Sequence, residues 1–380
     1  MNATRSTALS ASADSRAPDR GAPRTVAIWL LACCALVFAI VVVGGVTRLT
    51  HSGLSITEWQ PIVGTVPPLS AAQWDEAFVK YQATPEYRQV NKGMSLDAFK
   101  SIFRWEYAHR LLGRIVGAVF ALPLAWFVIR RKLPPGLAPP LLAIFAPGGL
   151  QGALGWYMVQ SGLIDDPRVS QLRLAAHLGL ALLIFAAMFW LALSLLRPSS
   201  EGPRAANAPA SRRDIALRHF SFLIAALVFV QALSGSLVAG IHAGFAYNTF
   251  PLMNGRIVPP GILSLAPWYR NFADNMATVQ FDHRIIAWLL ALLIPAVWLW
   301  VRAQVPSPRV KLAVNLLLAA LLLQLALGIA TLLLVVPLPL AAAHQAGAVL
   351  LFAAALNSAH ALRVGGRSGV ERRQARSERA

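Results

Sequence analysis

Long apolar runs recur along the chain, and each is about as long as a helix that crosses a lipid bilayer. The hydrocarbon core of a membrane takes roughly 20 residues of helix, and inside it each backbone N–H and C=O group must be bonded within its own segment. Helices meet that demand, so the runs predict membrane helices. Eight runs are found, with approximate limits 26–46, 108–129, 139–159, 174–196, 219–240, 284–302, 312–336 and 342–362. The third contains APGG at 146–149, which predicts a bend there.

The composition supports a membrane protein. Hydrophobic residues make up 57% of the 380 residues and charged residues 13%, whereas a soluble protein carries about 25% charged residues. The net charge of +18 is typical of nucleic-acid binding, but the basic residues gather in alternate loops and in both terminal tails. Such an arrangement is a topology signal that places these segments on the inner side of a membrane. We therefore expect membrane lipid around the helices, both termini in the cytoplasm, and no nucleic-acid partner.

The N-terminal tail bears on the compartment. It lacks an apolar stretch of its own, so we expect no cleaved secretory signal. Arginine, serine and alanine in the tail allow a mitochondrial transit peptide, but Asp14 and Asp19 disfavour one. The sequence therefore predicts a multi-pass protein of the bacterial inner membrane, with the mitochondrial inner membrane as the alternative.

The two halves of the sequence resemble each other. The segment 197–218 is a long polar break, and matching motifs lie on either side of it. The matched pairs are HRLLGRIVG (109–117) with HRIIAWLLA (283–291), QGALG (151–155) with QLALG (324–328), and LAAHLGLALLIF (174–185) with AAAHQAGAVLLF (341–352). A parallel repeat of this kind occurs in membrane proteins built by duplication.

The repeat predicts an all-α polytopic membrane protein, with eight transmembrane helices arranged as two pseudo-symmetric four-helix bundles. The expected divisions are a cytoplasmic tail (1–25), an N-terminal half (26–196), a cytoplasmic linker (197–218), a C-terminal half (219–362) and a second cytoplasmic tail (363–380).

Four histidines occupy corresponding places in the two halves. Each lies near the start of an even-numbered apolar run; they are His109, His177, His283 and His344. A lone histidine at a helix mouth is ordinarily an interfacial residue, but two pairs reproduced in register favour ligands. Imidazoles that face each other across a bundle suit an iron porphyrin with two axial nitrogen ligands. Zinc would need three or four closely grouped ligands, which these positions do not offer.

The neighbours of the histidines fit a porphyrin as well. Arg110 and Arg284 each follow a histidine, where a guanidinium could meet the propionates of the ring; contact with lipid headgroups is the alternative. Gly113 and Gly117 would leave one helix face slim enough for a flat ring, although close helix packing explains them equally well.

The halves differ at one carboxylate. Glu106 lies three residues before His109 on the same helix face, and the C-terminal half has Gln280 at the corresponding place. A carboxylate beside a bound ring could accept a proton or stabilise positive charge that develops on a carbon. The alternative is an acidic residue favoured by the helix dipole.

The first outer loop also differs, because residues 50–69 are rich in glycine, proline and tryptophan and predict an ordered cover. We therefore expect the N-terminal half to turn over a substrate and the C-terminal half to keep a resident cofactor. His51 and His242 follow the first and fifth runs, where they either orient a ligand or are solvated loop residues.

Several of these motifs together resemble those of haem A synthases, in the branch shared by mitochondria and proteobacteria. They are GGVTRLTHSGLSITEWQPIVGTVPPL (44–69), YQATPEYRQVN (81–91), GMSLDAFKSIFRWEYAHRLLGR (93–114), FDHRIIAW (281–288) and AAAHQAGAVLLF (341–352). Another branch of that family has a cysteine pair in the first outer loop. The two cysteines of this chain, Cys33 and Cys34, lie instead inside the first apolar run, which excludes a thiol-linked role of that kind.

The resemblance implies a haem-dependent oxidoreductase that converts haem O to haem A, by oxidising one ring methyl to a formyl group for terminal oxidase assembly. It implies that His283 and His344 ligate iron in a resident haem b, that His109 and His177 hold the substrate haem, and that Glu106 acts in the reaction. The implied partners are haem O synthase, oxidase assembly factors and an electron-transfer protein.

Two other functions fit the histidine pairs alone. One is a two-haem electron carrier between quinol and an acceptor at the outer face. The other is a haem transporter or chaperone. Neither explains the difference between Glu106 and Gln280.

Overall fold

The computed structural model describes residues 21–60, 63–164, 167–196 and 212–377, with side chains as far as Arg363. Most of the predicted N-terminal tail (1–20), most of the predicted linker (197–211) and residues 378–380 lie outside these ranges.

The described residues form eleven α-helices joined by loops and short 3-10 turns. No β-strand occurs among them, apart from an isolated bridge between Met253 and Arg256, so the all-α prediction is confirmed. The helices are α1 (Gly21–Leu49), α2 (Ala71–Gln82), α3 (Pro85–Gln89), α4 (Leu96–Ile129), α5 (Ala138–Leu163), α6 (Gln171–Leu196), α7 (Arg212–Gly240), α8 (Asn271–Asp274), α9 (Met276–Gln304), α10 (Pro308–Leu333) and α11 (Leu338–Ser377).

Seven of the described helices are long and apolar enough to cross a membrane, namely α1, α4, α6, α7, α9, α10 and α11. A multi-pass membrane protein is therefore confirmed. Helix α5 has 26 residues, as many as α6 and α10, but it is not among the seven helices that are apolar enough to cross a membrane. An eighth span thus stays a prediction, and α5 continues as one helix through Pro147, where we expected a bend.

Several helices extend beyond the predicted apolar limits. Helix α4 begins at Leu96, twelve residues before the predicted start, because the Ser95 hydroxyl caps it by accepting a hydrogen bond from the Ala98 N–H. His109 therefore lies about three and a half turns inside α4 and not at its mouth. At the other end of the chain, α11 continues past the predicted limit of 362 to Ser377.

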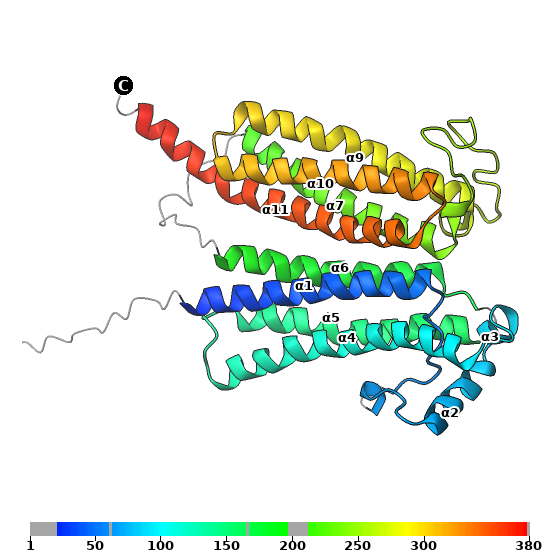
Figure 1. Ribbon diagram of the computed structural model, residues 1–380. Helices are drawn as coiled ribbons and strands as arrows, with labels where there is room; N and C mark the ends of the chain where they lie inside the picture. The colour runs from blue at the N-terminus through cyan, green and yellow to red at the C-terminus, as the bar shows by residue number, and fades with distance from the viewer. Residues whose placement is uncertain (1–20, 61–62, 165–166, 197–211, 378–380) are drawn as a thin grey trace, which may run out of the picture.

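The long helices lie in two groups of four, with α1, α4, α5 and α6 in one and α7, α9, α10 and α11 in the other (Figure 1). The groups meet along α1 and α6 on one side and α7 and α11 on the other. A buried apolar core runs through both, and a hydrogen bond of 2.7 Å from the Gln345 side chain to the Val41 carbonyl joins α11 to α1. This arrangement puts the four histidines in two separate helix groups.

Residues 70–95, which we call the cap, form α2 and α3 and pack against the first turns of α4 (Figure 1). Their contact is a small aromatic core in which Tyr81, Phe99 and Phe103 are buried. Ser70 begins α2 with a reciprocal capping box that includes Gln73. The sequence predicted an ordered cover over 50–69 but not these helices.

A buried carboxyl group lies inside the cap. Glu86 is 4% exposed, and its carboxyl oxygen accepts a hydrogen bond of 3.2 Å from the Tyr81 hydroxyl. The pKa of Glu86 is raised to about 7, chiefly by burial; the Tyr81 hydrogen bond lowers it and the charge of nearby Glu106 adds a smaller upward shift. Since this pKa lies above the ordinary value of 4.5, the folded cap retains a proton that the unfolded cap releases between these pH values.

We predict that the cap loses stability as the pH rises from about 4.5 to about 7, by at most roughly 3 kcal/mol. Glu86→Gln should abolish this dependence, because the amide has no proton to lose. Hydrogen exchange of α2 and α3 at pH 5 and pH 8 measures the effect. Glu76→Gln, on the exposed face of α2, is the matched control and should behave as the wild type. Equal pH dependence of the wild type and Glu86→Gln would contradict the assignment.

Candidate functional site

The four predicted histidines lie in two pairs, one in each helix group. His283 on α9 and His344 on α11 have ring centroids 6.5 Å apart, with ring planes at 78°. Two imidazoles bonded to one metal at about 2 Å on opposite sides have centroids roughly 6 Å apart, so the observed spacing fits a shared iron. His109 on α4 and His177 on α6 are close enough for their charges to interact.

Each of these imidazoles packs against a glycine on a neighbouring helix. A Cβ atom added at that glycine would come within 2.8 to 2.9 Å of the ring at three of the four sites, which forces the ring to shift, and within 3.2 Å at Gly235, where the ring would have to move by a few tenths of an ångström. The pairs are Gly44 of α1 with His109, Gly155 of α5 with His177, Gly235 of α7 with His283, and Gly328 of α10 with His344. We call each pair an imidazole seat.

We expected Gly113 and Gly117 to flank a flat ring, but neither is one of the four glycines that pack against a histidine ring. A Cβ at Gly113 would make an ordinary contact of 3.5 Å with Ile40, and a Cβ at Gly117 would have no neighbour within 4 Å. Neither packs against a histidine ring.

Three of the four seats include a glutamine one helical turn before the glycine. Gln151, Gln231 and Gln324 donate hydrogen bonds of 2.9, 3.1 and 2.9 Å to the backbone carbonyls of the seated histidines. Glutamine and glycine are four residues apart, so they lie on one helix face. Both therefore contact the same histidine, the glutamine at its backbone and the glycine at its ring. At the fourth seat, Ile40 occupies this place. The sequence shows this signal as QGALG, QALSG and QLALG, but its role was not predicted.

The seats contain buried polar atoms that lack a partner. Among the described residues, Nδ1 of His177, His283 and His344 has no hydrogen bond, and neither has Oε1 of the three glutamines. Such atoms cost free energy unless something completes the site. Pairs of imidazoles with unsatisfied nitrogens fit an iron porphyrin with two axial histidines. In the described part of the chain no three histidine, cysteine or acidic residues gather as a zinc centre requires, and Cys33 and Cys34 are free and buried.

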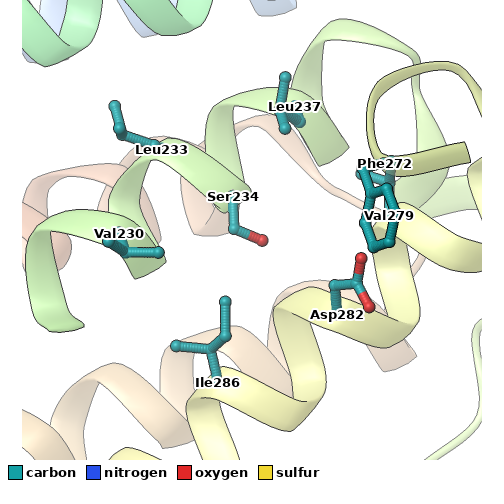
Figure 2. A pocket seen from close by; sticks show the side chains of 8 residues that line it. All are labelled: Val230, Leu233, Ser234, Leu237, Phe272, Val279, Asp282 and Ile286. Carbon is teal, nitrogen blue, oxygen red and sulfur yellow. The ribbon is translucent and has the colours of Figure 1, made fainter. Parts of the chain in front are cut away.

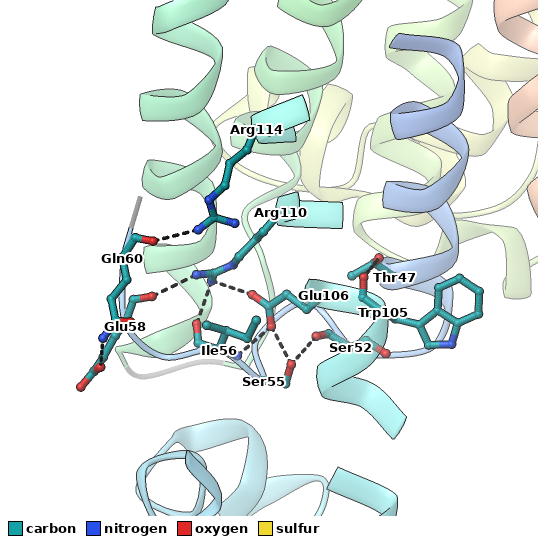
Figure 3. A network of polar contacts seen from close by, with 10 residues as sticks. All are labelled: Thr47, Ser52, Ser55, Ile56, Glu58, Gln60, Trp105, Glu106, Arg110 and Arg114. Atoms are coloured by element: carbon teal, nitrogen blue, oxygen red, sulfur yellow. Dashed lines mark hydrogen bonds and ion pairs between the residues drawn. The ribbon is translucent and has the colours of Figure 1, made fainter. Parts of the chain in front are cut away.

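Glu106 lies beneath the first outer loop and joins it to α4 (Figure 3). It is 2% exposed, and one carboxylate oxygen accepts hydrogen bonds from the Ser55 hydroxyl at 2.7 Å and the Ile56 N–H at 2.8 Å. The other oxygen forms an ion pair of 2.6 Å with Arg110. The Arg110 guanidinium also donates to the carbonyls of Ile56 and Glu58 at 2.7 and 3.0 Å. This pair therefore fixes the loop over the N-terminal histidines.

The C-terminal half holds its loop in the same way with an amide in place of the carboxylate. Gln280 donates to the Tyr247 carbonyl at 3.2 Å, and Arg284 donates to the carbonyls of Tyr247 and Thr249, both at 2.9 Å. Arg284 still has a buried Nε without a partner among the described residues. Both predicted propionate contacts, Arg110 and Arg284, thus lie beside the histidines and bind loop carbonyls.

His51 and His242 meet where the two halves join. Both have left-handed backbones, with φ of 51° and 58°, directly after α1 and α7. Their rings stack with centroids 6.0 Å apart. Partial burial lowers the pKa of His242, and the charges of Arg48, His51 and Arg168 lower it further. The sequence did not predict that these two residues touch.

Comparison with known proteins places the chain in a family. Residues 27–356 match the family described as cytochrome oxidase assembly protein. The haem A synthase of Nitrosospira multiformis is 60% identical over 340 residues, which cover 90% of this chain and 94% of the relative. That of Nitrosomonas eutropha is 58% identical, covering 87% and 92%, and that of Parvibaculum lavamentivorans is 47% identical, covering 89% and 94%. These findings confirm the resemblance of the motifs, and the chain belongs to the haem A synthase family of cytochrome oxidase assembly proteins.

Proposed function

We propose that the chain is a haem A synthase, a membrane oxidoreductase that oxidises one ring methyl of haem O to a formyl group and so provides haem A for terminal oxidases. Two observations carry the proposal. The first is 60% identity to a haem A synthase over nearly the whole chain. The second is that the described helices present two pairs of seated imidazoles, one for each haem that the reaction requires.

The proposed architecture has eight membrane spans in two halves, 26–196 and 219–362, with α5 as the eighth span. The length of α5 and its position among α1, α4 and α6 support this count (Figure 1). The bacterial relatives favour the bacterial inner membrane over the mitochondrial one. The basic loops favour both termini in the cytoplasm, with the cap on the outer side.

We assign the two haems to different halves. His283 and His344 would hold a resident haem b, and His109 and His177 would bind haem O as substrate. The assignment is supported by the seats: both C-terminal seats have a glutamine, whereas Ile40 replaces it beside His109. A more firmly held pair suits a permanent cofactor, and a looser pair suits a ligand that enters and leaves. Haem b, when bound, supplies a one-electron redox centre.

The residues of the N-terminal half would then serve the reaction in three ways. The seats of His109 and His177 orient the substrate ring. The first outer loop and the cap exclude water from its edge. Glu106, held by Ser55 and Arg110, presents a carboxylate that takes up a proton or stabilises positive charge on the reacting carbon. The methyl group would become the aldehyde by two successive hydroxylations to a geminal diol, which loses water; this is a four-electron oxidation and requires an external oxidant to accept the electrons.

Expression in a host that makes haem O but not haem A tests the function. The pigments are extracted and separated by chromatography. Formyl haem in the extract supports the synthase. Haem B alone would indicate an electron carrier, and bound but unchanged haem O would indicate a haem carrier; either result contradicts the proposal.

We predict that His283→Ala or His344→Ala removes the resident haem, whereas His177→Ala leaves it in place. His283 and His344 would ligate the iron of the resident haem, so either replacement deletes one of its two ligands. His177 would instead ligate the substrate haem. The haem B content of purified protein, measured as its pyridine complex, gives the result. Full haem B occupancy in His344→Ala would contradict the ligand assignment.

The seats give a second prediction, with a matched pair of variants on one helix. Gly155→Ala adds a methyl group 2.9 Å from the His177 ring, whereas Gly152→Ala adds one into open space. We expect Gly155→Ala to weaken haem O binding by roughly tenfold or more, since a shifted imidazole no longer reaches the iron. Titration of the purified proteins with haem O provides the measurement, and equal affinities of the two variants would contradict the seat.

The third prediction concerns Glu106. Glu106→Gln should keep both haems bound, because an amide can still hold the loop as Gln280 does in the other half. Haem O or a hydroxylated intermediate should accumulate, because the charge is lost; Glu106→Ala should have the same chemical effect with a looser loop. Chromatography of the extracted haems distinguishes the products. A normal yield of haem A from Glu106→Gln would show that Glu106 only positions the loop.

A further inference from the structure

A pocket of about 210 Å³ lies between α7 and α9 in the C-terminal half, beside the proposed resident haem (Figure 2). Its walls are apolar and include Val230, Leu233, Phe272 and Ile286. Val230 and Phe272 are each 45% exposed, so the pocket opens at the side of the helix pair, where lipid would surround the chain. A ligand would therefore enter from the membrane.

Two polar groups point into this apolar pocket from opposite helices. Figure 2 shows the Ser234 hydroxyl of α7 and the Asp282 carboxylate of α9 directed into the same space. Neither side chain has a hydrogen bond or ion pair with any described residue. A carboxylate in an apolar wall is costly to keep without a partner, and such residues in membrane helices mark binding sites.

The residues that line this pocket differ from those at the corresponding positions of the other half. The seats align Gly235 with Gly44 and His283 with His109. Their neighbours Ser234 and Asp282 then correspond to Val43 and Ala108, which have no polar group. Val279, which lines the pocket, corresponds to the far larger Trp105. Two converging polar groups and a smaller side chain, present in one half and not in the other, are features of a ligand site.

The chemistry of the pocket restricts the ligand. The Asp282 carboxylate requires a hydrogen-bond donor, which an acyl chain lacks, and it repels the phosphate of a phospholipid. The Ser234 hydroxyl can pair with a second oxygen across the pocket. Apolar walls with the Phe272 ring suit a flat aromatic group, and the volume admits one substituted ring but no porphyrin.

We propose that this pocket binds a quinol, with one ring hydroxyl donating to Asp282 and the other oxygen paired with Ser234. Gly235 and His283, the next residues along α7 and α9, form an imidazole seat, so the ring would be bound on the same helix pair as the resident haem. The reduced form should bind more tightly than the quinone, because the quinone has no hydrogen to donate to Asp282.

The test is a binding measurement on the purified holoprotein in nanodiscs free of endogenous quinone. A short-tailed ubiquinol is kept reduced under anaerobic conditions, and the bound fraction is determined by filtration and chromatography. We expect saturable binding at about one molecule per chain. Asp282→Ala, which introduces the residue of the other half, and Ser234→Ala, which removes only the hydroxyl, should each weaken it roughly tenfold or more. Leu292→Ala, on the lipid-exposed face of α9, is the control and should bind as the wild type.

Haem B content and the visible spectrum establish that each variant is folded. If Asp282→Ala loses haem, Ser234→Ala decides, because alanine removes only the hydroxyl group and adds no bulk to the pocket. Unsaturable binding, unchanged affinity in a folded variant, or equal competition by an alkylbenzene without hydroxyls would overturn the proposal. The proposal goes beyond haem A synthesis. A failure of quinol binding and a failure of the proposed synthase function can be told apart, because quinol binding is measured without haem A formation.

Discussion

The contact between an imidazole ring and a glycine on the neighbouring helix is the interaction on which this structure depends. It occurs four times, and at three of the four glycines a single added methyl group would force the ring to shift. Three of the four contacts are reinforced by a glutamine that bonds to the histidine backbone. Metal ligands must be held within a fraction of an ångström, so this packing suits the role that we propose for the four histidines.

Duplication explains the shared parts of the two halves, and substitution explains how they differ. Both halves seat two histidines and use an arginine to hold the following loop. Against that common plan, the N-terminal half has Ile40 for Gln231 and Glu106 for Gln280, while the C-terminal half has Asp282 for Ala108. In the proposed function the first two differences serve substrate exchange and chemistry on one side, and the third contributes to the proposed quinol pocket on the other.

The sequence predicted the helices and the histidines because each follows a strong rule. Lipid leaves a chain few alternatives to helix, and a repeat makes paired histidines visible. The start of α4 at Leu96 and the helices of the cap were missed, since they depend on capping and aromatic packing outside the apolar runs. The seats were missed for another reason. Which glycine meets which ring depends on the rotation of helices about their axes, and Gly113 and Gly155 look alike in a sequence.

The ring spacing of His283 and His344 fits two ligands on one iron, and this proposed ligation is central to the function. Electron paramagnetic resonance of the ferric protein, purified from a host that makes no haem O, measures the ligation itself. We predict that this ferric protein holds one low-spin haem B per chain with two imidazole ligands. A high-spin, five-coordinate haem, or protein that purifies folded without haem, would contradict it.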